Sequence, residues 1–196
     1  VLGRGTDDNT ALVMFGHFRA GQGGEIRQLP KSDVHAQGAR FTAPVFHAPA
    51  EGGRPAKDTL LNIEETGEFV TNMATEAMAK EMNLTSAYVG PEVDEFDLAK
   101  LDTLPSLLVK PLRVAASPIR MECRYFKTVE LPGSPDGGRA ALVIGTVLGI
   151  HIADEVMKDG LVDVGKIRPI GRLGYMDYTV VDTIFPMARP KAGAVG

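Results

Sequence analysis

The chain has a single cysteine, no long apolar run and no block of basic charge, and each absence excludes a class of protein. One thiol, Cys123, excludes an internal disulfide framework and a zinc site made of several cysteines, which suits a reducing compartment. Because no apolar run is long enough to span a membrane and the start Val1–Asn9 is polar, we expect a soluble, cytoplasmic protein without a membrane partner. The 21 Lys and Arg against 25 Asp and Glu argue against a nucleic-acid partner.

The size and composition are those of one globular domain. The chain has 196 residues, of which 44% are hydrophobic and 23% charged, so it can bury a substantial core. We assign residues 1–190 to this domain and residues 191–196 to a flexible tail. Since the sequence begins at Val1 rather than at Met, we expect a processed chain or a piece of a longer protein, with an atypical or incomplete N-terminal part.

Two long strands are expected. Residues 119–131 alternate between an apolar face and a face that carries Arg120, Glu122 and Arg124. Residues 141–152 form the second, and alternation places Gly145, Gly149 and His151 together on the face opposite Leu142, Ile144, Leu148, Ile150 and Ile152. Shorter strands are predicted at 11–15, at 40–46 with an interruption at Pro44, at 69–73 and at 178–185.

The helices are expected to be few and short. Asp58 is a plausible N-cap and Gly67 a helix end, and residues 76–82 predict a second helix with Ala77, Met78 and Met82 toward the core. Residues 19–37 and 93–96 read as loops. A doubly wound sheet needs a helix after nearly every strand, so this pattern favours a mostly β protein, an antiparallel β-barrel with a few short helices.

The segment Gly53–Asn72 resembles the signature of the flavin reductase-like family, the FMN-binding split β-barrels that include flavoredoxin. The resemblance continues in family order over roughly the final two thirds of the chain, through 82–87, 94–96, 117–124, 144–151 and 168–174. It departs at the N-terminus, where the family's opening strand is missing, Asn9–His17 is the nearest equivalent of the segment that wraps the flavin, and 19–37 is an insertion.

The resemblance implies a split β-barrel that binds FMN, with FAD as the other option, and works as a homodimer. It implies hydride transfer from NAD(P)H as co-substrate to the flavin, which then passes electrons to a partner monooxygenase or another acceptor. Two alternatives remain open: a non-enzymatic FMN electron carrier like flavoredoxin, and a dimeric binding module that has lost flavin.

The cofactor phosphate is expected at the start of the helix at 58–66. A helix N-terminus offers free N–H groups to an anion, while Lys57 adds charge and Thr59 a hydroxyl. The alternative is that Asp58 only caps the helix and Lys57 is a solvated cation.

Four further residues are candidates through the resemblance. His151 is a possible catalytic group near the nicotinamide end of the site, Arg172 a donor to flavin or pyridine nucleotide, and Asn72 and Asn83 contacts for polar edges of the flavin. The alternatives are that His151 is a strand histidine without a role, and that Arg172 and Tyr178, in the same segment, only take part in ordinary surface contacts such as a salt bridge of Arg172. The two asparagines could be present only because asparagine is common at strand and helix ends.

Other reactive side chains are given no catalytic role. Glu122, between Arg120 and Arg124 on a polar strand face, is expected to make only weak ion pairs. Cys123 faces the apolar side of its strand and is interpreted as inert packing. No metal site is predicted, because His17, His35 and His47 lack a ligand spacing.

Overall fold

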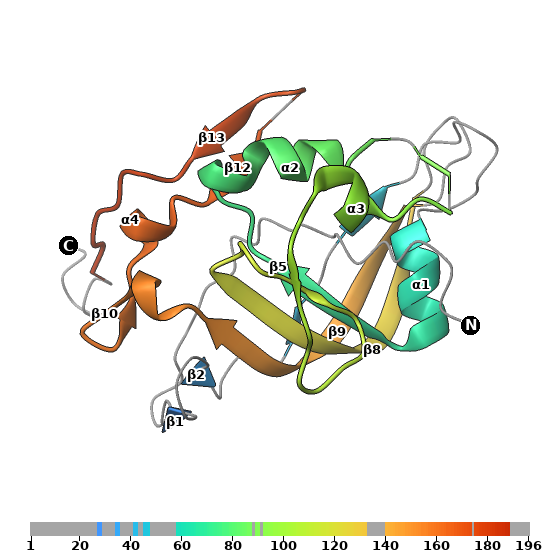
Figure 1. The fold of residues 1–196 in the computed structure, drawn as a ribbon, viewed down its shortest axis with the longest axis horizontal. Helices are drawn as coiled ribbons and strands as arrows, with labels where there is room; N and C mark the ends of the chain where they lie inside the picture. The colour runs from blue at the N-terminus through green and yellow to red at the C-terminus, as the bar shows by residue number, and fades with distance from the viewer. Residues whose placement is uncertain are drawn as a thin grey trace, which may run out of the picture.

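The computed structural model consists mostly of strands, with short helices between them (Figure 1). It describes residues 58–87, 89–90, 92–132, 140–173 and 175–188, together with the backbone of short strands that precede residue 58. These are β1 Arg27–Gln28, β2 Val34–His35, β3 Phe41–Thr42 and β4 Val45–His47. The expected strand at 11–15, Lys57 and the tail at 191–196 lie outside the described residues.

The main sheet is built on two long strands, β8 Ile119–Leu131 and β9 Ala140–Ile152, which pair antiparallel. The strand β5 Glu68–Asn72 pairs with β8, and β3 and β4 both pair with β9, so the order is β3-β9-β8-β5 with β4 beside β9. The predicted interruption at Pro44 is confirmed, because β3 ends before it and β4 begins after it. Within 19–37, predicted as a loop, β1 and β2 form a small antiparallel pair.

Two register shifts interrupt the pairing of β8 with β9. Gly149 lies opposite Glu122 whereas Val147 lies opposite Cys123, so Leu148 is an extra residue on β9. The second shift falls between Tyr125 and Lys127 on β8. Each extra residue turns the following side chains to the other face of the sheet.

The shifts overturn the face predicted for the glycines of β9. A Cβ on Gly145 would overlap the ring of Phe69, so this residue lies on the apolar core side. Gly149 and His151 pair with Glu122 and Arg120 on the opposite side. The prediction that all three share one face is therefore wrong.

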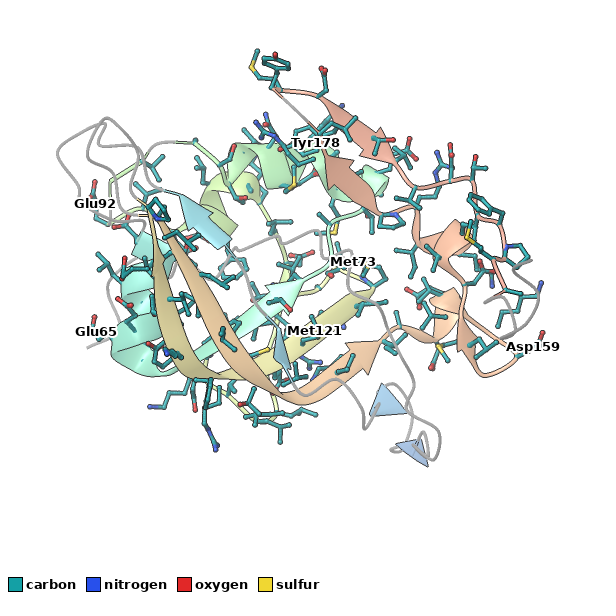
Figure 2. All side chains as sticks on the ribbon, turned by 180° about the vertical axis from the view of Figure 1, so that it is seen from behind. Glu65, Met73, Glu92, Met121, Asp159 and Tyr178 are labelled. Atoms are coloured by element: carbon teal, nitrogen blue, oxygen red, sulfur yellow. The ribbon has the colours of Figure 1, made fainter. Side chains whose placement is uncertain are left out.

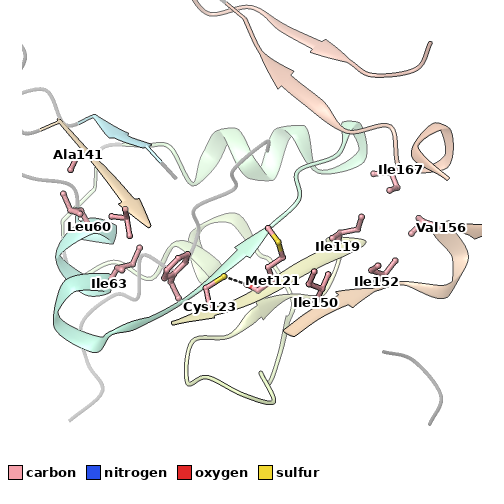
Figure 3. Packing of buried hydrophobic residues seen from close by; sticks show 12 residues of the cluster. Leu60, Ile63, Ile119, Met121, Cys123, Ala141, Ile150, Ile152, Val156 and Ile167 are labelled. Carbon is pink, nitrogen blue, oxygen red and sulfur yellow. Dashed lines mark hydrogen bonds between the residues drawn. The ribbon is translucent and has the colours of Figure 1, made fainter. Parts of the chain in front are cut away.

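The apolar core lies on one side of this sheet, between it and α1 Asp58–Thr66 (Figure 3). It contains Leu60, Ile63, Phe69, Ile119, Met121, Cys123, Ala141, Val143, Ile150, Ile152, Val156 and Ile167. Ala141 and Val143 take the place predicted for Leu142 and Ile144, because the extra residue Leu148 at the first shift changes the phase of the first half of β9. Met73 and Met121 lie inside the molecule, while Glu65 on α1 and Asp159 lie at its two ends (Figure 2).

The predicted end of α1 is confirmed, since Gly67 has a φ of +72° and its N–H donates to Ile63 O. The expected helix at 76–82 is a 3₁₀ turn, η2 Glu76–Met78, followed by α2 Ala79–Leu84. Met78 is buried, but the prediction for Ala77 is wrong because this side chain is exposed.

The loop predicted at 93–96 is wrong, because a helix, α3 Glu95–Ala99, begins there. Asp94 caps it by accepting the N–H of Phe96 at 2.8 Å, and the Phe96 side chain is buried beside Met78. A capping carboxylate and one buried aromatic were sufficient to form the helix.

Short elements complete the chain. The pair β6 Thr103–Leu104 and β7 Arg113–Val114 precedes β8. After β9 come η3 Asp154–Val156, β10 Met157–Lys158, β11 Leu161–Val162, α4 Val164–Ile167, β12 Ile170–Arg172 and β13 Tyr178–Val180. The last strand was predicted to reach residue 185. It ends at Val180 because its partner β12 has only three residues.

Candidate functional site

The first part of the candidate site is the start of α1. Asp58 is the first helical residue, and it and Thr59 are half-buried. Leu60 and Ile63 anchor the helix to the core, which fixes the direction of its N-terminal N–H groups. An exposed or half-exposed helix start of this kind provides donors and a partial positive charge for an anion.

The second part is the end of β5, where two polar side chains are buried. The Asn72 side chain is 2% exposed, and its Oδ1 accepts the N–H of Val114 at 3.0 Å. Asn72 Nδ2 and Thr71 Oγ1 have no hydrogen-bond partner among the described residues. A buried amide donor without a partner costs about 1–3 kcal/mol, so it is a group to which a ligand could bind favourably.

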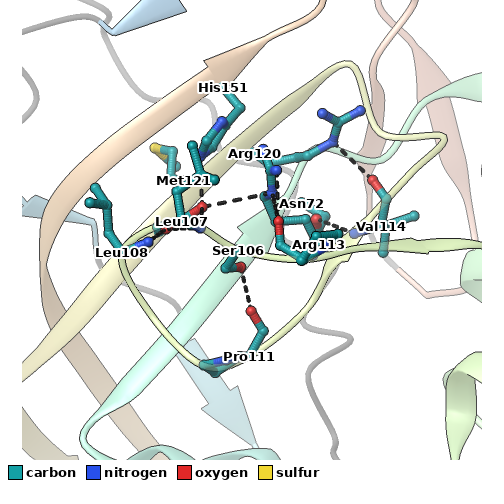
Figure 4. Close-up of polar contacts among 12 residues, drawn as sticks. Asn72, Ser106, Leu107, Leu108, Pro111, Arg113, Val114, Arg120, Met121 and His151 are labelled. Carbon is teal, nitrogen blue, oxygen red and sulfur yellow. Dashed lines mark hydrogen bonds and ion pairs between the residues drawn. The ribbon is translucent and has the colours of Figure 1, made fainter. Parts of the chain in front are cut away.

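A buried cluster of charged groups continues this sheet face from Asn72 (Figure 4). Arg120 lies directly across from Asn72 on one side and from His151 on the other. The side chains of Glu122 and His151 are both 0% exposed, and His151 Nε2 lies 2.7 Å from Glu122 Oε1. The structure therefore brings two predicted site residues, Asn72 and His151, to one buried face.

The cover over this face is the segment 103–116, which we call the strap. The backbone N–H groups of Leu107 and Leu108 donate to the carboxylate of Glu122, at 2.9 Å and 2.6 Å. Arg113 Nε lies 3.7 Å from the same carboxylate and also donates to Pro105 O within the strap. The leucine side chains of 107, 108 and 112 point outward and are exposed, so the strap is held to the sheet by polar contacts.

The surroundings of Glu122 orient its pair with His151. Two backbone N–H groups and a guanidinium converge on the carboxylate, whose oxygens accept from the N–H groups. In the contact between the two side chains, Nε2 of His151 donates to Glu122 Oε1. This arrangement fixes the orientation of the imidazole ring.

The sequence interpretation missed Glu122, Arg113 and Arg120. Alternation correctly placed Arg120, Glu122 and Arg124 on one face, but only Arg124 is exposed as expected. Pro105 and Pro111 interrupt the residues 103–116, which immediately precede β8, and this irregular segment was the available signal that something covers this face.

Arg172 and Asn83 lie elsewhere on the surface. Arg172 Nη1 donates to the Tyr178 hydroxyl at 2.9 Å, Nη2 donates to Tyr175 O, and the guanidinium lies 5.1 Å from the centre of the Tyr178 ring. Asn83 is exposed on α2. Among the described contacts, none joins either residue to Asn72 or His151.

Cys123 packs in the apolar core and has no exposed surface. Burial, and secondarily the charge of Glu122, raises the pKa of its thiol to about 12. The thiol therefore stays protonated at neutral pH, as expected for inert packing.

Similar solved structures identify the class of fold. Nitrilotriacetate monooxygenase component B from Bacillus cereus is similar with a TM-score of 0.66 and 27% identity, over 81% of this chain and 82% of that one. Flavoredoxin of Desulfovibrio vulgaris (Miyazaki F) has the same fold, with a TM-score of 0.58 and 19% identity over 83% of this chain and 84% of that one. The predicted fold class, a mostly β split barrel, is thereby confirmed.

The sequence model described as the flavin reductase like domain matches residues 50–171, and the chain belongs to this family. An uncharacterized protein of Halalkalibacterium halodurans is 33% identical over 134 residues, which are 68% of this chain and 64% of that protein. The chain spans a little more than half to just under two thirds of the length of the first curated relatives it matches. Among the described residues, no helix is long and apolar enough to cross a membrane.

Proposed function

We propose that this chain binds FMN and transfers hydride from NAD(P)H to it, as a reductase of the flavin reductase type. The observation that carries the proposal is the buried Asn72 amide, whose Nδ2 donor lacks a partner among the described residues. A flavin ring presents carbonyl and imine acceptors that an amide donor can meet. Membership of the flavin reductase like family supports the same assignment.

The phosphate of the cofactor is assigned to Lys57, Asp58 and Thr59. The half-buried start of α1 fits an anion, because the first N–H groups of a helix have no partners within it. Asn83 and Arg172 are retained as candidate contacts for the far part of the flavin or for the nucleotide. A bound flavin would supply the redox chemistry, so the protein needs only to bind, orient and shield it.

His151 can take part directly only if the groups that bury it move. Its side chain is completely buried and donates to Glu122, which also holds Leu107 and Leu108 of the strap. The place of His151 near the nicotinamide therefore requires the segments over it to open during the reaction cycle.

The acceptor that we propose for the reduced flavin is a monooxygenase. The similar Bacillus cereus protein is component B of nitrilotriacetate monooxygenase, which supports a two-component arrangement. We also propose that the chain is a homodimer. The flavoredoxin-like electron carrier is the alternative, and the following experiment separates it from the reductase.

The first measurement is a fluorescence titration of the purified chain with FMN and with FAD. Saturable binding of one FMN per chain, followed by rapid oxidation of NADH or NADPH, is the result expected of the reductase. Binding of FMN without that oxidation would favour the electron-carrier alternative. No binding at micromolar protein would favour the flavin-free binding module.

Two substitutions test the assignment of the phosphate site separately. Lys57→Ala and Thr59→Val should each weaken FMN binding, by about tenfold for the loss of one charge-assisted contact. Lys80→Ala on α2 and Thr66→Val at the other end of α1 are matched controls, since both side chains are exposed. Equal affinity of all four variants would show that the phosphate binds elsewhere.

A further inference from the structure

The strap is anchored to the sheet at several places: the N–H of Lys110 donates to Glu68 Oε2 at 2.9 Å, and Glu122 and Arg120 hold it further, the last of these next to the Asn72 amide. Glu122 holds the first half of the strap through Leu107 and Leu108. Arg120 holds the second half: its Nε donates to Val114 O at 2.9 Å and its Nη2 donates to Ala115 O at 2.8 Å. Val114 is thus bound through its carbonyl by Arg120 and through its N–H by Asn72.

The contact with Val114 decides which way the Asn72 amide faces. An amide side chain has one accepting oxygen and one donating nitrogen. Because the N–H of Val114 points at the side chain, the oxygen must lie on that side, and the reverse orientation would bring two donors together. The Nδ2 donor is thereby directed away from the strap.

Arg120 is well placed to maintain this arrangement. It lies directly across from Asn72 in the sheet and is itself buried, at 8% exposed. Its planar guanidinium binds two successive carbonyls with two separate N–H groups, which a lysine ammonium cannot reproduce with the same geometry. Two fixed carbonyls hold the backbone on the C-terminal side of the Val114 Cα, and this restrains the adjoining peptide that carries the Val114 N–H.

We propose that Arg120 is a positioning residue for flavin binding: it holds Val114, and Val114 orients the Asn72 amide so that its NH₂ group is presented to the cofactor. This inference rests on the proposed function, because it assumes that Asn72 contacts the flavin. Arg120 does not touch the flavin itself.

The test is a double-mutant cycle on FMN affinity, with wild type, Arg120→Lys, Asn72→Ala and the double variant. We expect each single change to raise the Kd about tenfold, which corresponds to loss of one oriented hydrogen bond. In the Asn72→Ala background, Arg120→Lys should cause no further loss. A merely structural role would weaken binding by the same factor in both backgrounds, and that additivity would overturn the proposal.

Controls keep folding and binding apart. Thermal melts establish that each variant is folded, and Arg120→Gln, which keeps a donor for one carbonyl, replaces Arg120→Lys if the latter does not fold. Arg124→Lys, on the exposed part of the same strand, should bind FMN like wild type. In the flavin-free protein, Arg120→Lys should shift the side-chain NH₂ resonances of Asn72, whereas Arg124→Lys should not. Unchanged NH₂ resonances in folded Arg120→Lys would contradict the proposal.

The outcomes also separate this inference from the proposed function. If wild type binds FMN and Asn72→Ala binds equally well, the positioning role of Arg120 is overturned while the reductase assignment stands. If wild type binds no flavin, the proposed function fails and this inference fails with it.

Discussion

Cys123 is buried in the apolar core on β8, next to Glu122 in the chain, and its chemistry follows from that position. Because burial raises the pKa of the thiol to about 12, the reactive thiolate is absent at neutral pH. We expect no reaction with iodoacetamide in the native protein at about pH 8 and complete reaction in denaturant, measured by mass spectrometry. Rapid labelling of the native protein would show that this part of β8 opens.

The same thiol makes stability depend on pH in the alkaline range. Its pKa is about 12 in the folded protein against 9.0 for an unperturbed thiol, so the unfolded chain loses the proton first. The stabilisation is complete below pH 9.0 and decreases as the pH rises toward 12, by about 1.4 kcal/mol per pH unit at most. Urea unfolding of Cys123→Ala should therefore show a shallower decline than wild type, and parallel curves would contradict this.

Glu122 offers a test of the buried charges. In Glu122→Gln an NH₂ group replaces a carboxylate oxygen among the N–H groups of Leu107 and Leu108 and the side chain of His151. We expect a loss of about 3 kcal/mol in the free energy of unfolding, because a buried pair is broken and donors lose their acceptor. Glu130→Gln, exposed on the same strand, should change it by about 0.5 kcal/mol or less.

At the scale of elements, Gly145 on β9 makes room for a side chain of β5, which lies on the other side of β8 in the sheet. A Cβ at this position would overlap the buried ring of Phe69. Gly145→Ala should therefore reduce stability by about 1–3 kcal/mol, measured by denaturant unfolding. Phe69→Leu should partly relieve the overlap, so the double variant should be less destabilised than the two single changes predict together. Full additivity would place the strain elsewhere.

The paired strands β8 and β9 show how much of the strand structure could be predicted from the sequence. Residues 119–131 alternate except at Phe126 and Lys127, where one register shift falls, and β8 has the predicted bounds. Nearly every residue from Ala140 to Ile152 is apolar or glycine, so the sequence of β9 carries no sign of where its phase changes. The extra residue Leu148 arises from the fit of one strand against the other, which a single strand's pattern does not contain.

The burial of the polar sheet face could not be predicted from the sequence, for a related reason. The family resemblance selected Asn72 and His151, and the structure places them on one face, but their roles remain predictions. Charged residues on a strand normally face solvent, so Arg120 and Glu122 were assigned to an exposed side. Their burial depends on the strap, whose hold on the sheet is made by backbone groups that every residue possesses.

At the scale of the whole molecule, apolar side chains remain uncovered after the last strands form. In the part that the structure describes, large exposed ones gather in residues 173–187, among them Tyr175, Met176, Phe185 and Met187. We expect the proposed homodimer to bury some of these side chains.

Light scattering should therefore give twice the 20.9 kDa of one chain. Phe185→Glu combined with Met187→Glu should shift the protein toward the monomer, because a dimer would bury two charges per chain without partners. Leu84→Glu, at an exposed apolar residue of α2, is the control and should not change the mass. A monomeric wild type would contradict the proposed dimer.

The long hairpin of β8 and β9 also implies an order of events during folding. Its strands are close in sequence, so their pairing requires closure of only a short connection, whereas β3, β4 and β5 must join it from distant parts of the chain. Glu122 and Arg120, which hold both halves of the strap, lie on this hairpin, so the strap cannot be fully bound until the hairpin exists. In pulsed hydrogen exchange during refolding, the amides of β8 and β9 should become protected before those of Leu107, Leu108 and Val114. Mutations that slow hairpin formation would then delay the appearance of the Asn72 site, even if they leave the finished site unchanged.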